Sequence, residues 1–68
     1  MKNNIWYAVM MDKEDSDWGT GSFDLNEAMN MVREYRANGY SDAYIAVIDE
    51  NDGYGAVCID EIHDLEVE

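Results

Sequence analysis

Proline is absent from this sequence, cysteine occurs once, and lysine and arginine together number 4 among 68 residues. The single cysteine, Cys58, excludes the internal disulfide framework that stabilises many small secreted domains. Long hydrophobic runs are absent as well. The longest, Ile5–Met11, is too short to cross a bilayer or to form the apolar part of a signal peptide. We therefore expect a cytoplasmic protein that does not insert into a membrane.

The scarcity of basic residues contrasts with 16 aspartates and glutamates, which give a formal net charge of -12. Phosphate binding requires clustered lysine and arginine, and here Arg33 and Arg36 are the basic pair that lies close together. The negative field also repels anionic membrane surfaces and attracts cationic proteins, more weakly as salt rises. We expect no direct binding of nucleic acid or of membranes.

The length of the chain fits one domain. A domain of this size buries roughly 60% of the surface that its unfolded chain exposes, so its core is thin. Hydrophobic residues make up 47% of the sequence, which separates it from disordered chains of high net charge. We expect residues 1–68 to form a single small acidic domain.

Three apolar segments have the composition of strands. Ile5–Met11 is rich in aromatic and β-branched residues. Ala43–Ile48 and Ala56–Ile59 flank a polar, glycine-containing segment at 49–55, which predicts an antiparallel hairpin. Ile62–Glu68 alternates loosely between apolar and acidic residues, so it fits either a short strand extension or a frayed end.

One helix is predicted after Asp24. Apolar residues at helical spacing form a stripe of Leu25, Ala28, Met29, Val32 and Tyr35. Asp24 can accept a hydrogen bond from the free N–H groups at the helix start, and Glu27 completes a capping-box-like pattern. Asn38 and Gly39 predict the end of the helix, because either residue tolerates the left-handed conformation found there.

These elements predict an α+β fold, a single-layer three-stranded sheet with one helix on one face, in the order β-α-β-β. A right-handed crossover through the helix would make the first two strands parallel. The place of the third strand in the sheet stays open. All three strands carry apolar residues at both parities, whereas one helix covers one face. We therefore expect a second copy of the chain or a protein partner to cover the other face.

Residues 12–22 predict a polar loop that carries four carboxylates, those of Asp12, Glu14, Asp15 and Asp17. Oxygen ligands at alternate positions suit calcium, but an EF-hand loop counted from Asp12 needs glutamate at Phe23. The turn that follows Asp49 fails the same test, because it has Tyr54 where glycine is needed. We expect a solvated loop and no metal site.

The stretch Gly19–Ser22 can be interpreted in two ways. Glycines before a helix can cradle a phosphate with backbone N–H groups, but the lysine of a Walker loop is missing and acidic residues flank the stretch. We expect instead that the glycines let the loop turn tightly while Ser22 or Asp24 caps the helix.

Trp18 is a large aromatic residue in a polar loop, where it can act as a binding hot spot or fold over the core edge and close the seam between helix and sheet. Met31 lies off the apolar stripe, which predicts an exposed contact. The predicted partner-binding residues are Asp15, Asp17, Trp18, Met31 and Tyr54.

Cys58 and His63 indicate no catalysis. A free cysteine in an apolar strand is usually a small buried hydrophobe. His63 has Glu61 and Asp64 as acidic neighbours, and no serine or cysteine stands at a recognisable catalytic spacing from it. We expect neither a catalytic residue nor a cofactor.

Four segments, Asp17–Asp24, Glu27–Ala28, Ile45–Asp49 and Cys58–Ile62, resemble segments of a group of short uncharacterised bacterial proteins. The resemblance covers most of the chain. Because no activity, cofactor or site is established for that group, the resemblance implies none here.

The functional expectation is a non-enzymatic protein-interaction or accessory domain that acts as a homodimer or with a protein partner. It follows from the apolar sheet face that the helix leaves without a cover. The alternative is an acidic mimic of nucleic acid that inhibits a DNA- or RNA-binding protein, because carboxylates can take the place of phosphates.

Overall fold

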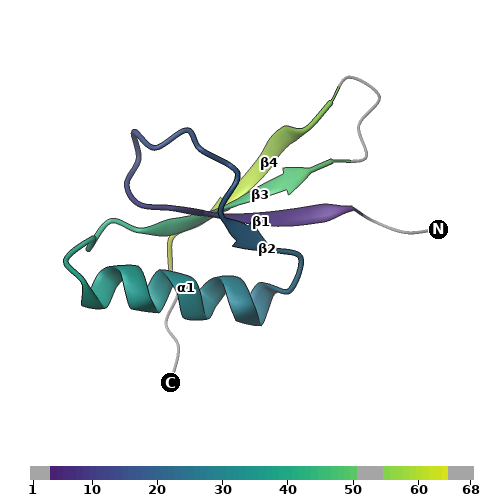
Figure 1. Ribbon diagram of the computed structural model, residues 1–68. Coiled ribbons are helices and arrows are strands. Elements are labelled where there is room, and N and C mark those ends of the chain that lie inside the picture. Colours follow the sequence, from purple (N-terminus) through teal and green to yellow (C-terminus); the bar gives the residue numbers. More distant parts are fainter. Residues whose placement is uncertain (1–3, 51–54, 65–68) are drawn as a thin grey trace.

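The computed structural model describes residues 4–50 and 55–64. Within them lie the helix α1 (Leu25–Ala37) and four strands, β1 (Ile5–Met10), β2 (Gly21–Ser22), β3 (Tyr44–Asp49) and β4 (Val57–Ile62). The strands form one open sheet in the order β2-β1-β3-β4, with α1 on one side of it (Figure 1). The predicted α+β class is confirmed, with four strands in place of three. In this part of the chain, no helix has the length and apolar character needed to span a membrane.

The strand directions correct the prediction that the first two long strands are parallel. β3 runs antiparallel to β1, and so does β2, which lies within the segment predicted as a loop. The chain therefore reverses once before it enters the helix. A crossover through a helix normally joins two parallel strands. Here those strands are β2 and β3, which lie on either side of β1. The predicted antiparallel hairpin of the last two strands is confirmed, with β4 at the outer edge.

β2 depends on a close approach between two backbones. Gly21 pairs with Ala8, and a Cβ atom added to Gly21 would lie 2.1 Å from the carbonyl oxygen of Tyr7. The φ angle of Gly21, 156°, is also one that other residues rarely adopt. Glycine at this position is therefore required for β2 to lie against β1.

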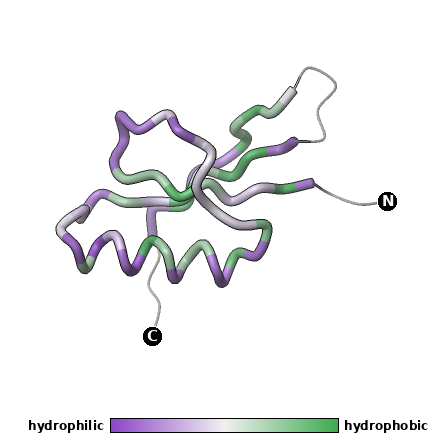
Figure 2. The backbone as a smooth tube through the Cα atoms, in the orientation of Figure 1, coloured by the Kyte–Doolittle hydropathy of each residue, from purple (hydrophilic) through white to green (hydrophobic). Residues whose placement is uncertain are grey.

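The helix face of the sheet carries one of two apolar clusters. Its buried members are Val9, Ala28, Val32, Ala43 and Ile45. The predicted stripe of α1 is confirmed, because its other residues pack against this cluster as partly buried side chains. Hydrophobic residues are concentrated along the strands, between the more hydrophilic loop and helix (Figure 2).

The opposite face carries the second cluster, whose buried members are Ala8, Met10, Tyr44, Ala46 and Ile48. Trp6 and Trp18 pack against it. The segment 11–20, between β1 and β2, lies on the side of the sheet away from α1 (Figure 1). The expectation that this face lacks an internal cover is therefore wrong, because the polar loop and its tryptophan supply one.

Both ends of α1 are capped. Asp24 Oδ1 accepts the N–H of Asn26 at 3.0 Å, as predicted for the N-cap. Glu27 does not complete the expected capping box directly: Ser22 Oγ donates to Glu27 Oε1 at 2.7 Å and accepts the N–H of Asp24 at 2.9 Å. The hydroxyl of Ser22 therefore bridges the side chain of Glu27 and the backbone of Asp24, and it joins β2 to the start of the helix.

The far end of α1 has the bonds of a Schellman motif. The N–H of Tyr40 donates to Tyr35 O at 3.0 Å, and the N–H of Gly39 donates to Arg36 O at 3.2 Å. Gly39, at φ 107°, is the left-handed residue, whereas Asn38 is not. The rings of Tyr35 and Tyr40, with centroids 5.7 Å apart, supply the apolar contact of the motif.

Candidate interaction surface

The acidic loop between β1 and β2 is ordered by its own carboxylates. Asp15 accepts the backbone N–H groups of Met11 and Asp17, each at 3.0 Å. Asp12 Oδ1 accepts the N–H of Glu14 at 3.0 Å, and Asp17 Oδ1 accepts the N–H of Gly19 at 2.9 Å. Aspartates commonly close tight turns in this way. The predicted solvated loop is thus a series of turns that carry Trp18 over the sheet.

Two side chains near this loop have clearly shifted pKa values. The backbone N–H groups of Met11 and Asp17 lower the pKa of Asp15, because they stabilise its ionised form. Burial raises the pKa of Tyr44, and the nearby charges of Glu61 and other acidic groups raise it further. Near neutral pH, Asp15 is therefore ionised and Tyr44 is protonated.

Trp18 is half-buried, and its position corrects the idea that it closes the seam between helix and sheet. It packs against the apolar cluster on the face away from α1, and its carbonyl oxygen accepts the indole N–H of Trp6 at 2.7 Å. Trp6 in turn contacts Phe23 edge to face, at 4.8 Å between centroids. The core role of Trp18 is therefore confirmed on the other face of the sheet.

Of the other predicted contact residues, Asp15 and Asp17 lie in the same loop as Trp18, whereas Met31 belongs to the opposite face of the sheet. Met31 is partly buried and packs against the cluster beneath α1, so the expectation of an exposed side chain is wrong. Asp17 is exposed in the loop, and Asp15 is partly buried there. Tyr54 lies outside the described residues. A partner-binding role for any of these residues stays a prediction.

β4 is the exposed edge of the sheet. It pairs with β3 alone among the described strands, and α1 packs against β1, β2 and β3. The Val57 end of β4 extends with β3 past the helix (Figure 1). Ile59 keeps 55% of its surface exposed. The pairing with β3 shifts register between Val47 and Ile48, which leaves Ile59 at a bulge.

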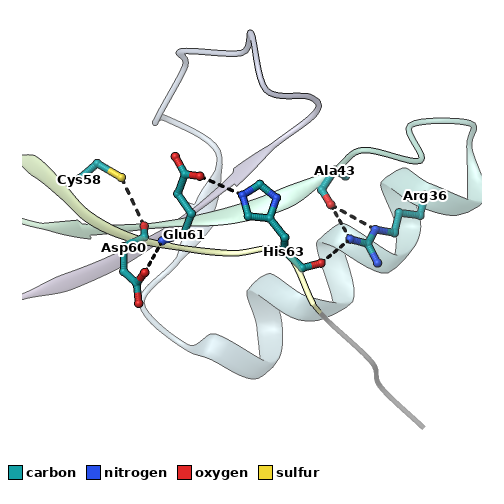
Figure 3. A network of polar contacts seen from close by, with 6 residues as sticks. All are labelled: Arg36, Ala43, Cys58, Asp60, Glu61 and His63. Carbon is teal, nitrogen blue, oxygen red and sulfur yellow. Dashed lines mark hydrogen bonds and ion pairs between the residues drawn. The ribbon is translucent and has the colours of Figure 1, made fainter.

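Polar contacts surround the middle of this edge. Asp60 Oδ1 accepts the backbone N–H of Glu61 at 2.8 Å, which places a carboxylate against the strand backbone (Figure 3). Cys58 Sγ donates to Asp60 O at 3.3 Å, and Glu61 Oε1 lies 2.9 Å from His63 Nε2. A shallow depression of about 480 Å³ is lined by Cys58, Ile59, Asp60, Glu61 and His63.

Cys58 is exposed, so the expectation of a buried cysteine is wrong. It lies on the edge strand β4, against which α1 does not pack. Its thiol is bonded to a carbonyl oxygen, and the ring nitrogen Nε2 of His63 is paired with Glu61. Among the described residues, the thiol of Cys58 and the ring of His63 are therefore bonded to other groups and not to each other.

Arg36 fixes the end of the edge strand to the helix. Its Nε and Nη2 donate to Ala43 O at 3.1 and 2.8 Å, and Nη2 donates to His63 O at 3.1 Å (Figure 3). The rigid fork of a guanidinium suits such a contact with two carbonyl groups. The ring of His63 is thereby held on that of Tyr44, with centroids 4.4 Å apart.

The negative charge of the molecule is little neutralised from within. Among the side chains of residues 4–50 and 55–64, leaving Asp49 aside, no ion pair joins a lysine or arginine to a carboxylate, and Arg36 is hydrogen-bonded to carbonyl oxygens instead. The same residues contain no group of histidine, cysteine and acidic side chains that could hold a metal ion. The carboxylates thus leave a surface that attracts cations in general.

Sequence reasoning missed the acidic middle of β4. The predicted strand ended at Ile59, because Asp60 and Glu61 break the apolar run. That a strand lies at an edge is a property of the whole sheet, so the local pattern carried no signal for it. No family model, curated protein or solved structure matches this chain. The resemblance to short bacterial proteins therefore stays a prediction.

Proposed function

We propose that this protein is a non-enzymatic interaction domain that binds a positively charged partner protein. The observation that carries this proposal is the net charge of -12, and it is supported by the absence of ion pairs from lysine or arginine to the described carboxylates other than Asp49. Such a surface attracts a cationic partner at long range and rejects anionic ones. The cytoplasmic location that we expect from the single cysteine belongs to this proposal.

The two groups with shifted pKa values, Asp15 and Tyr44, are not suited to proton transfer near neutral pH. General acid–base catalysis needs a group whose pKa lies near the working pH. The surroundings lower the pKa of Asp15, whose ordinary value already lies below neutral pH, and raise the pKa of Tyr44, whose ordinary value already lies above it. Both shifts move away from neutrality, so neither group is prepared for proton transfer.

A second copy of the chain is a poorer partner than a basic protein. Two copies each carry a charge of -12 and repel one another. The apolar face that was expected to require a second copy is covered by the loop that carries Trp18. We therefore place a cationic protein ahead of the homodimer. A nucleic-acid-binding protein is one such partner, so the acidic mimic is a special case of this function.

The proposal is tested by affinity capture from a native lysate with the whole chain as bait, at about 50 and about 300 mM salt, since screening rises over that range. We expect basic proteins to be captured at low salt and released at high salt. The partner must then bind in purified form with the same salt dependence. Capture that is insensitive to salt, or that yields no basic protein, would refute the proposal.

A matched control separates charge from fold. Glu14→Gln, Glu34→Gln, Asp42→Asn and Glu50→Gln together remove four negative charges from exposed side chains for which the structure shows no hydrogen bond. We expect this variant to fold normally and to bind the partner more weakly at low salt, because the long-range attraction is reduced. Equal binding by the two proteins would show that charge does not drive the interaction.

A further inference from the structure

The free edge of β4 combines features that recognise a strand. A strand at the edge of a sheet leaves backbone N–H and C=O groups unpaired on its outer side. β4 has a neighbour on one side within the described sheet and exposes Cys58, Ile59, Asp60 and Glu61. The opposite edge is less available, because the two-residue strand β2 covers the middle of β1.

We propose that β4 is the binding site, and that its occupant is an extended, basic segment of the partner protein that adds to the sheet as a further strand. This inference rests on the proposed function and specifies its site. The segment alternates basic and apolar residues, since successive side chains of a strand point to opposite faces. Backbone hydrogen bonds along β4 provide affinity, and side chains provide the selection of a cationic segment.

The depression beside β4 fits the side chain of a lysine or arginine. Cys58 and Ile59 offer contact to its aliphatic part, and Asp60 and Glu61 offer carboxylates to its charged end. A volume of about 480 Å³ is ample for one such side chain. The bulge at Ile59 bends the strand at the point where the apolar and acidic residues meet.

The same acidic residues exclude a second copy of β4. Pairing of two β4 strands would bring Asp60 and Glu61 of both chains together, and like charges across a strand pair are destabilising. The carboxylate of Asp60 against the Glu61 backbone adds to this repulsion. A partner strand with lysine or arginine opposite Asp60 and Glu61 removes this repulsion. The edge is thus protected against self-pairing and selective for a basic strand.

The test uses the whole ¹⁵N-labelled chain and a hexapeptide of alternating lysine and valine. Two control peptides replace every lysine with glutamate, or keep the lysines and methylate alternate backbone nitrogens. We expect slowed amide exchange at residues 57–62, roughly tenfold weaker binding of the methylated peptide, and no binding of the acidic one. The methylated peptide has the same charge, so its loss of affinity measures backbone pairing.

Two charge reversals and one charge removal locate the site. We expect Asp60→Lys to weaken binding of the lysine–valine peptide roughly tenfold, and Glu34→Lys, the same change on the exposed side of α1, to weaken it less than about twofold. Asp60→Asn keeps an acceptor oxygen for the Glu61 N–H and removes the charge alone. An affinity of Asp60→Asn between those of the original protein and Asp60→Lys would show that the charge of Asp60 contributes to binding independently of its hydrogen bond to the backbone.

The outcomes separate this inference from the proposed function. Equal binding of the plain and methylated peptides, or equal effects of Asp60→Lys and Glu34→Lys, would overturn the β4 site and leave a diffuse acidic interaction. Failure of the lysine–valine peptide to bind at about 20 mM salt, where screening is weak, would also overturn the β4 site, whereas the proposed function fails only if affinity capture yields no salt-sensitive basic partner.

Discussion

One face of the sheet is covered by a helix whose apolar residues recur at helical spacing in the sequence. The other face is covered by a loop whose sequence has no periodicity. Both faces hold fully buried residues, such as Ile45 beneath the helix and Ala8 beneath the loop. In a domain this small, an irregular segment can cover a sheet face if aspartates close its turns and one tryptophan contacts the core. The comparison shows that burial does not require regular structure.

The loop is joined to the sheet at one point that tolerates no side chain, and this gives the largest expected effect. Gly21→Ala places a Cβ atom 2.1 Å from Tyr7 O, so β2 must separate from β1. We expect a loss of stability on the order of 3 kcal/mol or more, from strain and from the disturbed cover on the loop face. Urea unfolding measures it.

Gly39→Ala is the matched control. Gly39 also has a positive φ angle, 107°, but an added Cβ atom meets nothing within 4 Å. We expect a loss of about 1 kcal/mol from backbone conformation alone. Similar losses for the two substitutions would mean that the contact of β2 with β1 is unimportant for the loop face.

Trp18→Ala removes the main contact of the loop with the sheet. We expect a loss of roughly 2–3 kcal/mol, below the range for a fully buried tryptophan because Trp18 is half-buried. The substitution uncovers the cluster opposite α1, so binding of a hydrophobic dye should increase. Phe23→Ala is the control, since Phe23 keeps 61% of its surface exposed. Equal losses for the two variants would contradict a covering role for Trp18.

Periodicity explains how much of the two faces could be predicted. The stripe from Leu25 to Tyr35, the N-cap Asp24 and the glycine that ends α1 were all visible, because each is decided by residues within a few positions. β2 was missed because two residues make no pattern. Because β2 was missing from the prediction, β3 was predicted to run parallel to β1, whereas it runs antiparallel. Tertiary pairing, not local preference, decided that point.

The candidate site depended even more on long-range contacts. Asp60 and Glu61 were read as the end of a strand, yet β4 continues through them to Ile62 because β3 supplies hydrogen-bond partners along that length. Met31 was expected to be exposed because it lies off the stripe, but the core cluster under α1 reaches it. Both errors concern the boundary of the core, which a single chain segment does not define.

Arg36 tests how the helix face is held at its end. Arg36→Met keeps much of the aliphatic side chain and removes the donors to Ala43 O and His63 O. We expect a loss of roughly 1–2 kcal/mol, because the partly buried carbonyl group of Ala43 and the exposed one of His63 lose a charged donor. Arg33→Met is the control on the same helix, where the side chain is exposed. If both variants unfold at the same urea concentration, the Arg36 contacts do not hold the helix in place.

The smallest effect concerns the turns of the loop face and depends on pH. Asp15 has a lowered pKa in the folded protein, because backbone N–H groups bond its ionised form. Its contribution to stability is therefore present above the unfolded pKa of about 3.9 and is lost as pH falls through the lower folded value. We expect Asp15→Asn to cost less than about 1 kcal/mol at pH 7, since the site is largely solvated.

The same variant separates this pH dependence from that of the other carboxylates. The difference in unfolding free energy between the original protein and Asp15→Asn should shrink as the solution is acidified below the unfolded pKa of about 3.9. Glu14→Gln serves as the control, because no hydrogen bond of the Glu14 side chain is shown, and it should leave the acid limb unchanged. A constant difference for Asp15→Asn as the pH falls below that value would mean that ionised Asp15 does not hold the loop over the sheet.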